Sequence, residues 1–255
     1  MKPRVLQHNV AWALAGNGGY AACQWALLIA ITKFGTATDV GRFALALALT
    51  GPVMMFASLH LRAVQATDAA GSFEFGSYLG LRLVTTAMAL AAIGVSAWVS
   101  SAPDTFALVI VVALAKGVEA LSDVLYGRLQ CFERQRRIAG SMLVRGAGSV
   151  VAVVATLATG GTLVTAIACM TLAWLVCLLV IDLPAVRGTT ALQPDLRPAT
   201  LRPLFWTALP MGCVMALGTL TVNVPRYTLE APSGTAALGH FAAIAYLFVA
   251  AMQPM

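Results

Sequence analysis

Charged residues are scarce in this sequence. Asp, Glu, Lys and Arg make up 10% of the 255 residues, against about 25% in an ordinary soluble domain. Hydrophobic residues make up 60%, and the mean hydropathy is +0.85. A soluble chain of this length needs many more polar side chains to cover its surface. The composition therefore excludes soluble globular, disordered and fibrous proteins, and it indicates that most of the chain lies in lipid.

The sequence also lacks the usual signs of an enzyme or a metalloprotein. Its five cysteines form no CxxC pair, so we interpret them as small buried hydrophobic residues without a redox or metal role. His8, His60 and His240 are scattered, which argues against a zinc site. No GxGxxG, Walker A, HExxH or GxSxG motif occurs. We expect no enzymatic activity, no cofactor and no metal, and the dispersed basic residues predict no nucleic-acid partner.

Long apolar runs are the main feature that is present. A helix needs about 20 apolar residues to cross a bilayer, and these runs are too long for the strands of a membrane barrel. They predict an all-α, polytopic transmembrane bundle of about eight helices. The runs are 10–31, 40–61, 78–99, 105–126, 138–158, 162–181, 204–224 and 236–252.

The distribution of Lys and Arg predicts the orientation of the bundle. With the N-terminus in the cytoplasm, twelve of these residues fall on the cytoplasmic side, and Lys33, Arg42 and Arg226 fall on the other. Cytoplasmic loops carry an excess of Lys and Arg, so this bias predicts a multi-pass protein with a cytoplasmic N-terminus.

A Pro- and Arg-rich stretch divides the chain. We predict a first six-helix lobe at 1–182, a cytoplasmic linker at 183–203 and the first two helices of a second, incomplete lobe at 204–255. A weak repeat supports this division, because GTATDVGRFA at 35–44 resembles GTAALGHFA at 234–242 and both would lie in turns outside the membrane. Chance similarity remains the alternative. If the repeat is real, we expect a C-terminally truncated chain.

Three charged residues lie inside the fourth run. Lys116, Glu119 and Asp123 are spaced i, i+3 and i+7, so they share one helical face. Each charge costs about 2.5–3.5 kcal/mol at the centre of a membrane helix and is a functional candidate. We predict that Lys116 contacts substrate and that Glu119 and Asp123 bind a coupling ion or proton. The alternative is a structural network that pairs internally.

Three arginines lie near the ends of predicted membrane helices. Arg62 closes the second run, Arg82 opens the third, and Arg145 lies about two turns into the fifth. Guanidinium groups bind phosphates in a bidentate manner, so these residues are candidates for binding a pyrophosphate head group. The alternative is that they extend to the membrane surface and set topology.

Amides and a proline suggest two further features. Asn223 and Arg226 flank Pro225 near the end of the seventh run, where a break in the helix would turn both toward a cavity mouth. The alternative is a simple helix end. Asn17 and Gln24 lie seven residues apart in the first run, and we expect them to form hydrogen bonds between helices.

Several stretches occur in a characteristic order along the chain. They are LRAVQATD at 61–68, YLGLR at 78–82, GRLQ at 127–130 with Glu133 and Arg134, Ser141 with Arg145 and Gly146, and NVPRY at 223–227 with Leu238 and Gly239. These stretches resemble bacterial polysaccharide-biosynthesis flippases, including O-antigen flippases, of the multidrug/oligosaccharidyl-lipid/polysaccharide exporter (MOP) superfamily, and the resemblance runs over nearly the whole chain. It implies two pseudo-symmetric six-helix lobes around a central cavity, in the bacterial cytoplasmic (inner) membrane. It supplies no universal set of site residues.

The resemblance and the charged residues together lead to three functional hypotheses. The first is a flippase or exporter that moves lipid-linked oligosaccharides of the polyprenyl-pyrophosphate type by alternating access. The second is a cation-coupled multidrug-type antiporter that uses Glu119 and Asp123. The third is a non-transporting membrane subunit of a polysaccharide assembly complex. The expected partners are the lipid-linked glycan, membrane lipids and other polysaccharide-assembly proteins.

Overall fold

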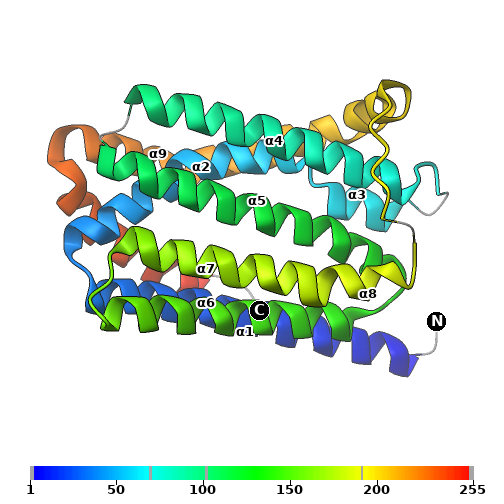
Figure 1. Cartoon of the computed structure of the whole chain (residues 1–255), viewed down its shortest axis with the longest axis horizontal. Coiled ribbons are helices and arrows are strands. Elements are labelled where there is room, and N and C mark those ends of the chain that lie inside the picture. Colours follow the sequence, from blue (N-terminus) through cyan, green and yellow to red (C-terminus); the bar gives the residue numbers. More distant parts are fainter. Residues whose placement is uncertain (1–2, 69–70, 101–102, 191, 253–255) are drawn as a thin grey trace.

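The computed structural model describes the backbone of residues 3–68, 71–100, 103–190 and 192–252, and the side chains of residues 7–68, 71–99, 105–190, 192–224 and 228. Within these residues all regular elements are helices, which confirms the predicted all-α polytopic bundle (Figure 1). The elements are α1 Pro3–Phe34, α2 Ala37–Ser58, α3 Leu61–Thr67, α4 Phe75–Ser100, α5 Pro103–Cys131, α6 Gln135–Ala158, α7 Leu163–Cys177, the π-helical turn η1 Leu178–Asp182, α8 Leu183–Arg187 and α9 Pro198–Met252.

Local sequence signals explain where several helices begin and end. Thr36 and Asp39 form a reciprocal capping box at the start of α2, where the Asp39 N–H donates to the Thr36 hydroxyl at 3.2 Å and the Thr36 N–H donates to Asp39 at 2.9 Å. The predicted run 40–61 is too long, because Leu59 and His60 adopt left-handed backbone angles and separate α2 from α3. The run 162–181 is divided between α7 and η1.

The last two predicted runs lie within α9. The backbone of 225–235, where we expect a turn between two helices, is helical, and the orange part of α9 bends at one end of the bundle in Figure 1. A proline removes one backbone donor, but its φ angle is compatible with a helix, and membrane helices tolerate this loss. Pro52 likewise lies inside α2. The side chains of 234–242, which carry the second copy of the weak repeat, lie outside the described residues.

Five helical stretches among the described residues are long and apolar enough to cross a membrane. Their outer faces carry exposed apolar side chains such as Met88, Val151 and Leu172, which lipid would cover. Cys131, Cys169 and Cys213 are also exposed at the surface of the bundle, so the prediction that the cysteines are buried is wrong for these three. The five stretches are Ala37–Thr67, Phe75–Val99, Gln135–Ala158, Leu163–Arg187 and Pro198–Val224.

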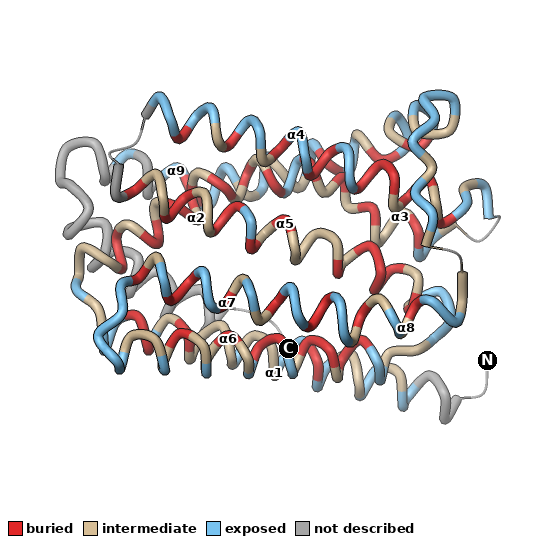
Figure 2. The backbone as a smooth tube through the Cα atoms, in the orientation of Figure 1, coloured by how far each residue is buried: buried red, intermediate tan, exposed pale blue. Residues whose placement is uncertain are grey.

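The helices run side by side, and α5 lies at the centre of the arrangement (Figure 1). It packs against α2 and α4 on one side and α7 on the other, while α1 packs along α6 and α2 packs along α9. Its residues are buried or half-buried along nearly the whole helix, whereas exposed residues recur along α4 (Figure 2). The charged face of α5 is therefore inside the bundle.

Candidate functional site

The charged residues of α5 do not form one group. Lys116 and Glu119 pair with each other, with Nζ 2.8 Å from Oε2. Asp123 instead contacts two arginines from other helices. The face predicted from the i, i+3, i+7 spacing is therefore divided between two clusters.

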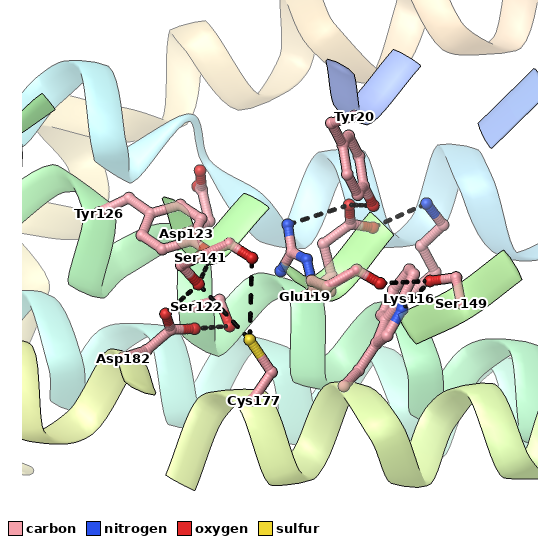
Figure 3. Close-up of polar contacts among 12 residues, drawn as sticks. Tyr20, Lys116, Glu119, Ser122, Asp123, Tyr126, Ser141, Ser149, Cys177 and Asp182 are labelled. Atoms are coloured by element: carbon pink, nitrogen blue, oxygen red, sulfur yellow. Dashed lines mark hydrogen bonds and ion pairs between the residues drawn. The ribbon is translucent and has the colours of Figure 1, made fainter. Parts of the chain in front are cut away.

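We call the first of these the Arg145 cluster; it consists of Tyr20, Lys116, Glu119 and Arg145. The Tyr20 hydroxyl donates to Glu119 Oε1 at 3.1 Å (Figure 3). Arg145 Nη2 lies 4.0 Å from the same oxygen, at the limit of an ion pair. Close packing of α1 on α6 brings Tyr20 to this place, since a Cβ on Gly146 would lie 2.9 Å from the Cβ of Cys23.

Aromatic rings surround the guanidinium of Arg145. Its carbon lies 5.1, 5.6 and 5.2 Å from the ring centroids of Tyr20, Tyr126 and Trp174, within the range of cation–π attraction. Arg145 is 4% exposed, and its Nε and Nη1 atoms have no hydrogen-bond partner among the residues that the structure describes. Buried polar atoms are normally paired, so this side chain has unused capacity for binding an anion.

The second group, which we call the Arg82 cluster, consists of Arg62, Arg82 and Asp123. Arg82 Nη2 donates to Asp123 Oδ2 at 3.1 Å, and Arg62 Nη1 lies 3.6 Å from Oδ1. Arg62 Nε also donates to Gln130 at 3.1 Å. Both arginines are thus held by polar partners from α5. The ring of Tyr126 lies between the clusters, 5.7 Å from the guanidinium carbon of Arg62 and 5.6 Å from that of Arg145.

Asp182 is a buried residue that the sequence analysis missed. It directly precedes the predicted linker at 183–203, and it is 1% exposed. Ser122 donates to its Oδ2 at 2.7 Å, and Ser141 donates to its Oδ1 (Figure 3). Ser122 was not predicted to matter, and Ser141 was named only in the resemblance to the flippases. The apolar sequence directly before Asp182 is the signal that could have placed it inside the bundle.

A cavity of about 490 Å³ lies beside the Arg145 cluster, between α1, α2, α5 and α7. Tyr20, Lys116 and Trp174 belong to its lining and also to the cluster or its aromatic surroundings. Asn17 and Gln24 line the cavity as well. The sequence predicts that these two amides form hydrogen bonds between helices, and the structure places both of them at the cavity.

Of the two remaining predicted site residues, only Asn223 has a described side chain, and it lies apart from both clusters. Asn223 is 5% exposed and donates to the Thr219 carbonyl oxygen at 2.8 Å within α9. Its amide nitrogen lies 3.8 Å from the position of a Cβ on Gly51, so it packs against α2 and belongs to neither cluster. The Arg226 side chain lies outside the described residues.

The clusters carry an excess of positive charge. The charged face of α5 alone has one ammonium and two carboxylates, but Arg62, Arg82 and Arg145 join from α3, α4 and α6. Four cations, including Lys116, therefore face the two carboxylates Glu119 and Asp123. Within this site the balance favours an anionic ligand.

Comparison with known proteins gives one curated relative. The chain is 26% identical over 243 residues to the capsular polysaccharide biosynthesis protein CapF of Staphylococcus aureus. The match covers 94% of this chain and 61% of the relative, so the chain spans about three-fifths of that protein's length. No family model matches the chain.

Solved structures of MOP superfamily transporters have a similar fold. A transporter from Pyrococcus furiosus superposes with a TM-score of 0.63 at 18% identity, covering 96% of this chain and 59% of that one. A MATE transporter in complex with MaD5 gives 0.59 at 18% identity, with 94% and 59% covered. The inward-facing form of a multidrug resistance MATE transporter gives 0.52 at 16% identity, with 94% and 57% covered.

The comparisons confirm the resemblance seen in the sequence. Identities below 25% show the fold alone, and that fold is the one found in MOP superfamily transporters. The chain is a multi-pass membrane protein with this transporter fold, and it is similar in sequence to a protein of capsular polysaccharide biosynthesis.

Proposed function

We propose that this chain moves lipid-linked oligosaccharides across the bacterial cytoplasmic membrane by alternating access, with Arg145 as a binding group for the phosphate. The observation that carries this proposal is the pair of unpartnered guanidinium nitrogens, Nε and Nη1, on a side chain that is 4% exposed. A guanidinium forms strong, bidentate hydrogen bonds with phosphate oxygens. The similarity to a capsular polysaccharide biosynthesis protein supports a glycan as the rest of the substrate.

Neighbouring charges support an anionic substrate. Lys116 is half-buried beside the cavity and shares Glu119 with Arg145. The Arg82 cluster offers a second cationic position farther along α5. Lys116 and Asp123 are seven residues apart, which corresponds to about 10 Å along the helix axis. A phosphate group that leaves Arg145 would therefore meet Arg62 and Arg82 within a short movement.

The fold also supports a cation-coupled antiporter as a second candidate, because two of the similar structures are MATE transporters. In that mechanism Glu119 and Asp123 would bind the coupling cation. Both carboxylates already have partners: Glu119 contacts Lys116 and Tyr20, and Asp123 contacts two arginines. A coupling cation would have to displace these cations, and this favours the anionic substrate.

A transport assay tests the proposal. The chain is reconstituted in liposomes with a fluorescent, short-chain polyprenyl-pyrophosphate sugar, and transfer is measured as loss of access to a membrane-impermeant quencher. We expect transfer by the wild-type chain and about thirtyfold weaker substrate binding by Arg145→Gln, because hydrogen bonds to a charged group are lost. Arg202→Ala is the matched control, since Arg202 is an exposed arginine on α9.

The other possible results of this transport assay favour the competing hypotheses. Uptake of a cationic dye against a proton or sodium gradient, without glycan transfer, would support the antiporter. If neither substrate moves while the chain remains folded, the non-transporting subunit is favoured. Full glycan transfer by Arg145→Gln would remove Arg145 from the phosphate site.

A further inference from the structure

The cavity next to the Arg145 cluster has a lining that the proposed phosphate site does not explain. Its volume of about 490 Å³ falls within the range of about 300–1,000 Å³ that is common for small-molecule sites. The lining is mostly apolar, and its polar side chains are Asn17, Tyr20, Gln24 and Lys116, with Trp25 and Trp174 adding indole rings. A cavity made for a lipid tail would need no amides.

The chemistry of this lining matches a sugar ring. Each amide of Asn17 and Gln24 offers a donor and an acceptor, as hydroxyl and acetamido groups require. Trp25 and Trp174 supply large, rigid, apolar surfaces on which the C–H face of a sugar can pack. The indole N–H of Trp174 is occupied, because it donates to the Ser149 hydroxyl at 2.6 Å. Trp174 therefore contributes its ring face and not its donor.

Charge argues against a cationic occupant. The ionisable side chains in the lining are Lys116 and Tyr20, and no carboxylate is among the described lining residues. Glu119, which is nearest along α5, already holds the Lys116 ammonium at 2.8 Å. A drug-like cation would thus meet an ammonium group and no free negative charge. A neutral ligand with several hydroxyl groups meets no such repulsion.

The position of the cavity matches the covalent structure of a lipid-linked glycan. In such a molecule the first sugar is bonded directly to the phosphate, so its pocket must adjoin the phosphate site. Tyr20 and Trp174 line the cavity and also face the Arg145 guanidinium, at 5.1 and 5.2 Å from their ring centroids. We propose that the cavity between α1, α2, α5 and α7 binds the sugar residue bonded to the phosphate, and that this residue is neutral and carries hydroxyl or acetamido groups. This inference rests on the proposed function.

Ligand-observed NMR with the chain in lipid nanodiscs tests this site, with free N-acetylglucosamine and inorganic pyrophosphate as separate probes. We expect saturable N-acetylglucosamine binding by the wild-type chain. Gln24→Ala should weaken it about tenfold, because buried hydrogen bonds are lost. Trp25→Ala should abolish it, whereas Trp25→Phe keeps an aromatic face and should retain most of it. Trp98→Ala is the matched control, because Trp98 is 78% exposed on α4.

The two probes separate this inference from the proposed function. Pyrophosphate binding without N-acetylglucosamine binding would overturn the sugar site and leave the phosphate site standing. Sugar binding that depends on Trp25, without pyrophosphate binding, would overturn the phosphate site and leave the sugar site standing. Equal sugar binding by the wild type and a folded Trp25→Ala variant would also overturn the sugar site. Arg145→Gln should lose pyrophosphate binding and keep sugar binding.

Discussion

The two charged clusters on α5 use similar residues in different ways. In the Arg82 cluster, the carboxylate of Asp123 is held at 3.1 Å by an arginine whose side chain is 1% exposed. In the Arg145 cluster, the arginine is equally buried, but its distance to the carboxylate of Glu119 is 4.0 Å. Among the described residues, one fully buried nitrogen of Arg82, Nε, lacks a hydrogen-bond partner, whereas two of Arg145, Nε and Nη1, lack one.

This difference distinguishes an arginine that is mainly paired from one that has more unused hydrogen-bonding capacity. The ion pair of Asp123 with Arg82 joins α4 to α5. Arg145 is positioned mainly by aromatic rings, which stabilise a cation without using its N–H donors. Burial alone therefore does not distinguish the two arginines. The number of unused buried donors does, and it is the reason for proposing Arg145 as the phosphate-binding group.

Removing the buried arginine from each cluster should give the largest contrast in stability. Arg82→Met leaves Asp123 with only the longer contact to Arg62, and we expect a loss of about 3 kcal/mol in the free energy of unfolding. Arg145→Met removes a weaker ion pair and should cost about 1 kcal/mol. Thermal or denaturant unfolding in detergent measures both.

A double variant is the control for this contrast. Asp123→Leu combined with Arg82→Met replaces the ion pair by apolar side chains and should recover most of the lost stability. Equal losses from Arg82→Met and Arg145→Met would show that the clusters do not differ in the way the contact distances indicate.

Displacing the linker from α4 should destabilise only the end of the bundle that holds the Arg82 cluster. Residues 193–195 lie directly on α4, where the Asp195 N–H donates to the Gly76 carbonyl oxygen at 2.9 Å. A Cβ on Gly80 would collide with the Asp195 carbonyl oxygen. Gly80→Ala must displace this segment, and we expect a loss of about 2 kcal/mol with faster proteolysis between 189 and 197.

A second glycine of α4 provides the matched variant. A Cβ on Gly94 would meet nothing within 4 Å, so Gly94→Ala should stabilise the helix by about 0.5–1 kcal/mol. Unchanged proteolysis of the linker in Gly80→Ala would mean that the segment is not held against α4. Pyrophosphate binding at Arg145 should be unaffected by either substitution.

Sequence spacing predicted the charged face of α5 but not its division. The i, i+3, i+7 pattern placed Lys116, Glu119 and Asp123 on one face, and these residues do lie inside the bundle. Their arginine partners come from α3, α4 and α6. Which arginine meets which carboxylate depends on how the helices pack, and helical periodicity carries no information about that.

The features that the sequence did not predict also depend on how the helices pack. Asp182 follows an apolar run and precedes a proline, a pattern typical of a helix end, yet serines on α5 and α6 compensate for its burial. The polar face of Asn17 and Gln24 was identified, but only the packing of four helices shows that it borders a cavity. Apolar runs predicted most helices because lipid requires each backbone donor to be satisfied within its own segment.

Neutralising Glu119 and neutralising Asp123 should change the affinity for pyrophosphate to different extents. Glu119→Gln removes the negative charge that competes for Arg145 and Lys116, so we expect about fivefold tighter binding of inorganic pyrophosphate. Asp123→Asn should change this affinity by less than about twofold, since its partners belong to the other cluster. NMR titration in nanodiscs measures both. Weaker pyrophosphate binding by Glu119→Gln would instead support a cation site at this carboxylate.

The smallest effect should come from Asp68, which stabilises the loop beside the Arg82 end. The Ser72 N–H, at 2.9 Å, and then the Phe73 N–H and Tyr78 hydroxyl, each at 3.2 Å, donate to its carboxylate and lower its pKa, although burial opposes them. Because the folded-state pKa is lowered, this stabilisation is present above the unfolded pKa of about 4 and is lost as pH falls through the folded value. Asp68→Asn should cost less than about 1 kcal/mol at pH 7, since the group is only partly buried and is screened by solvent. The difference from wild type should shrink in unfolding measurements as the pH falls below about 4. A difference that does not depend on pH would mean that the shape of the side chain, and not its charge, causes the effect.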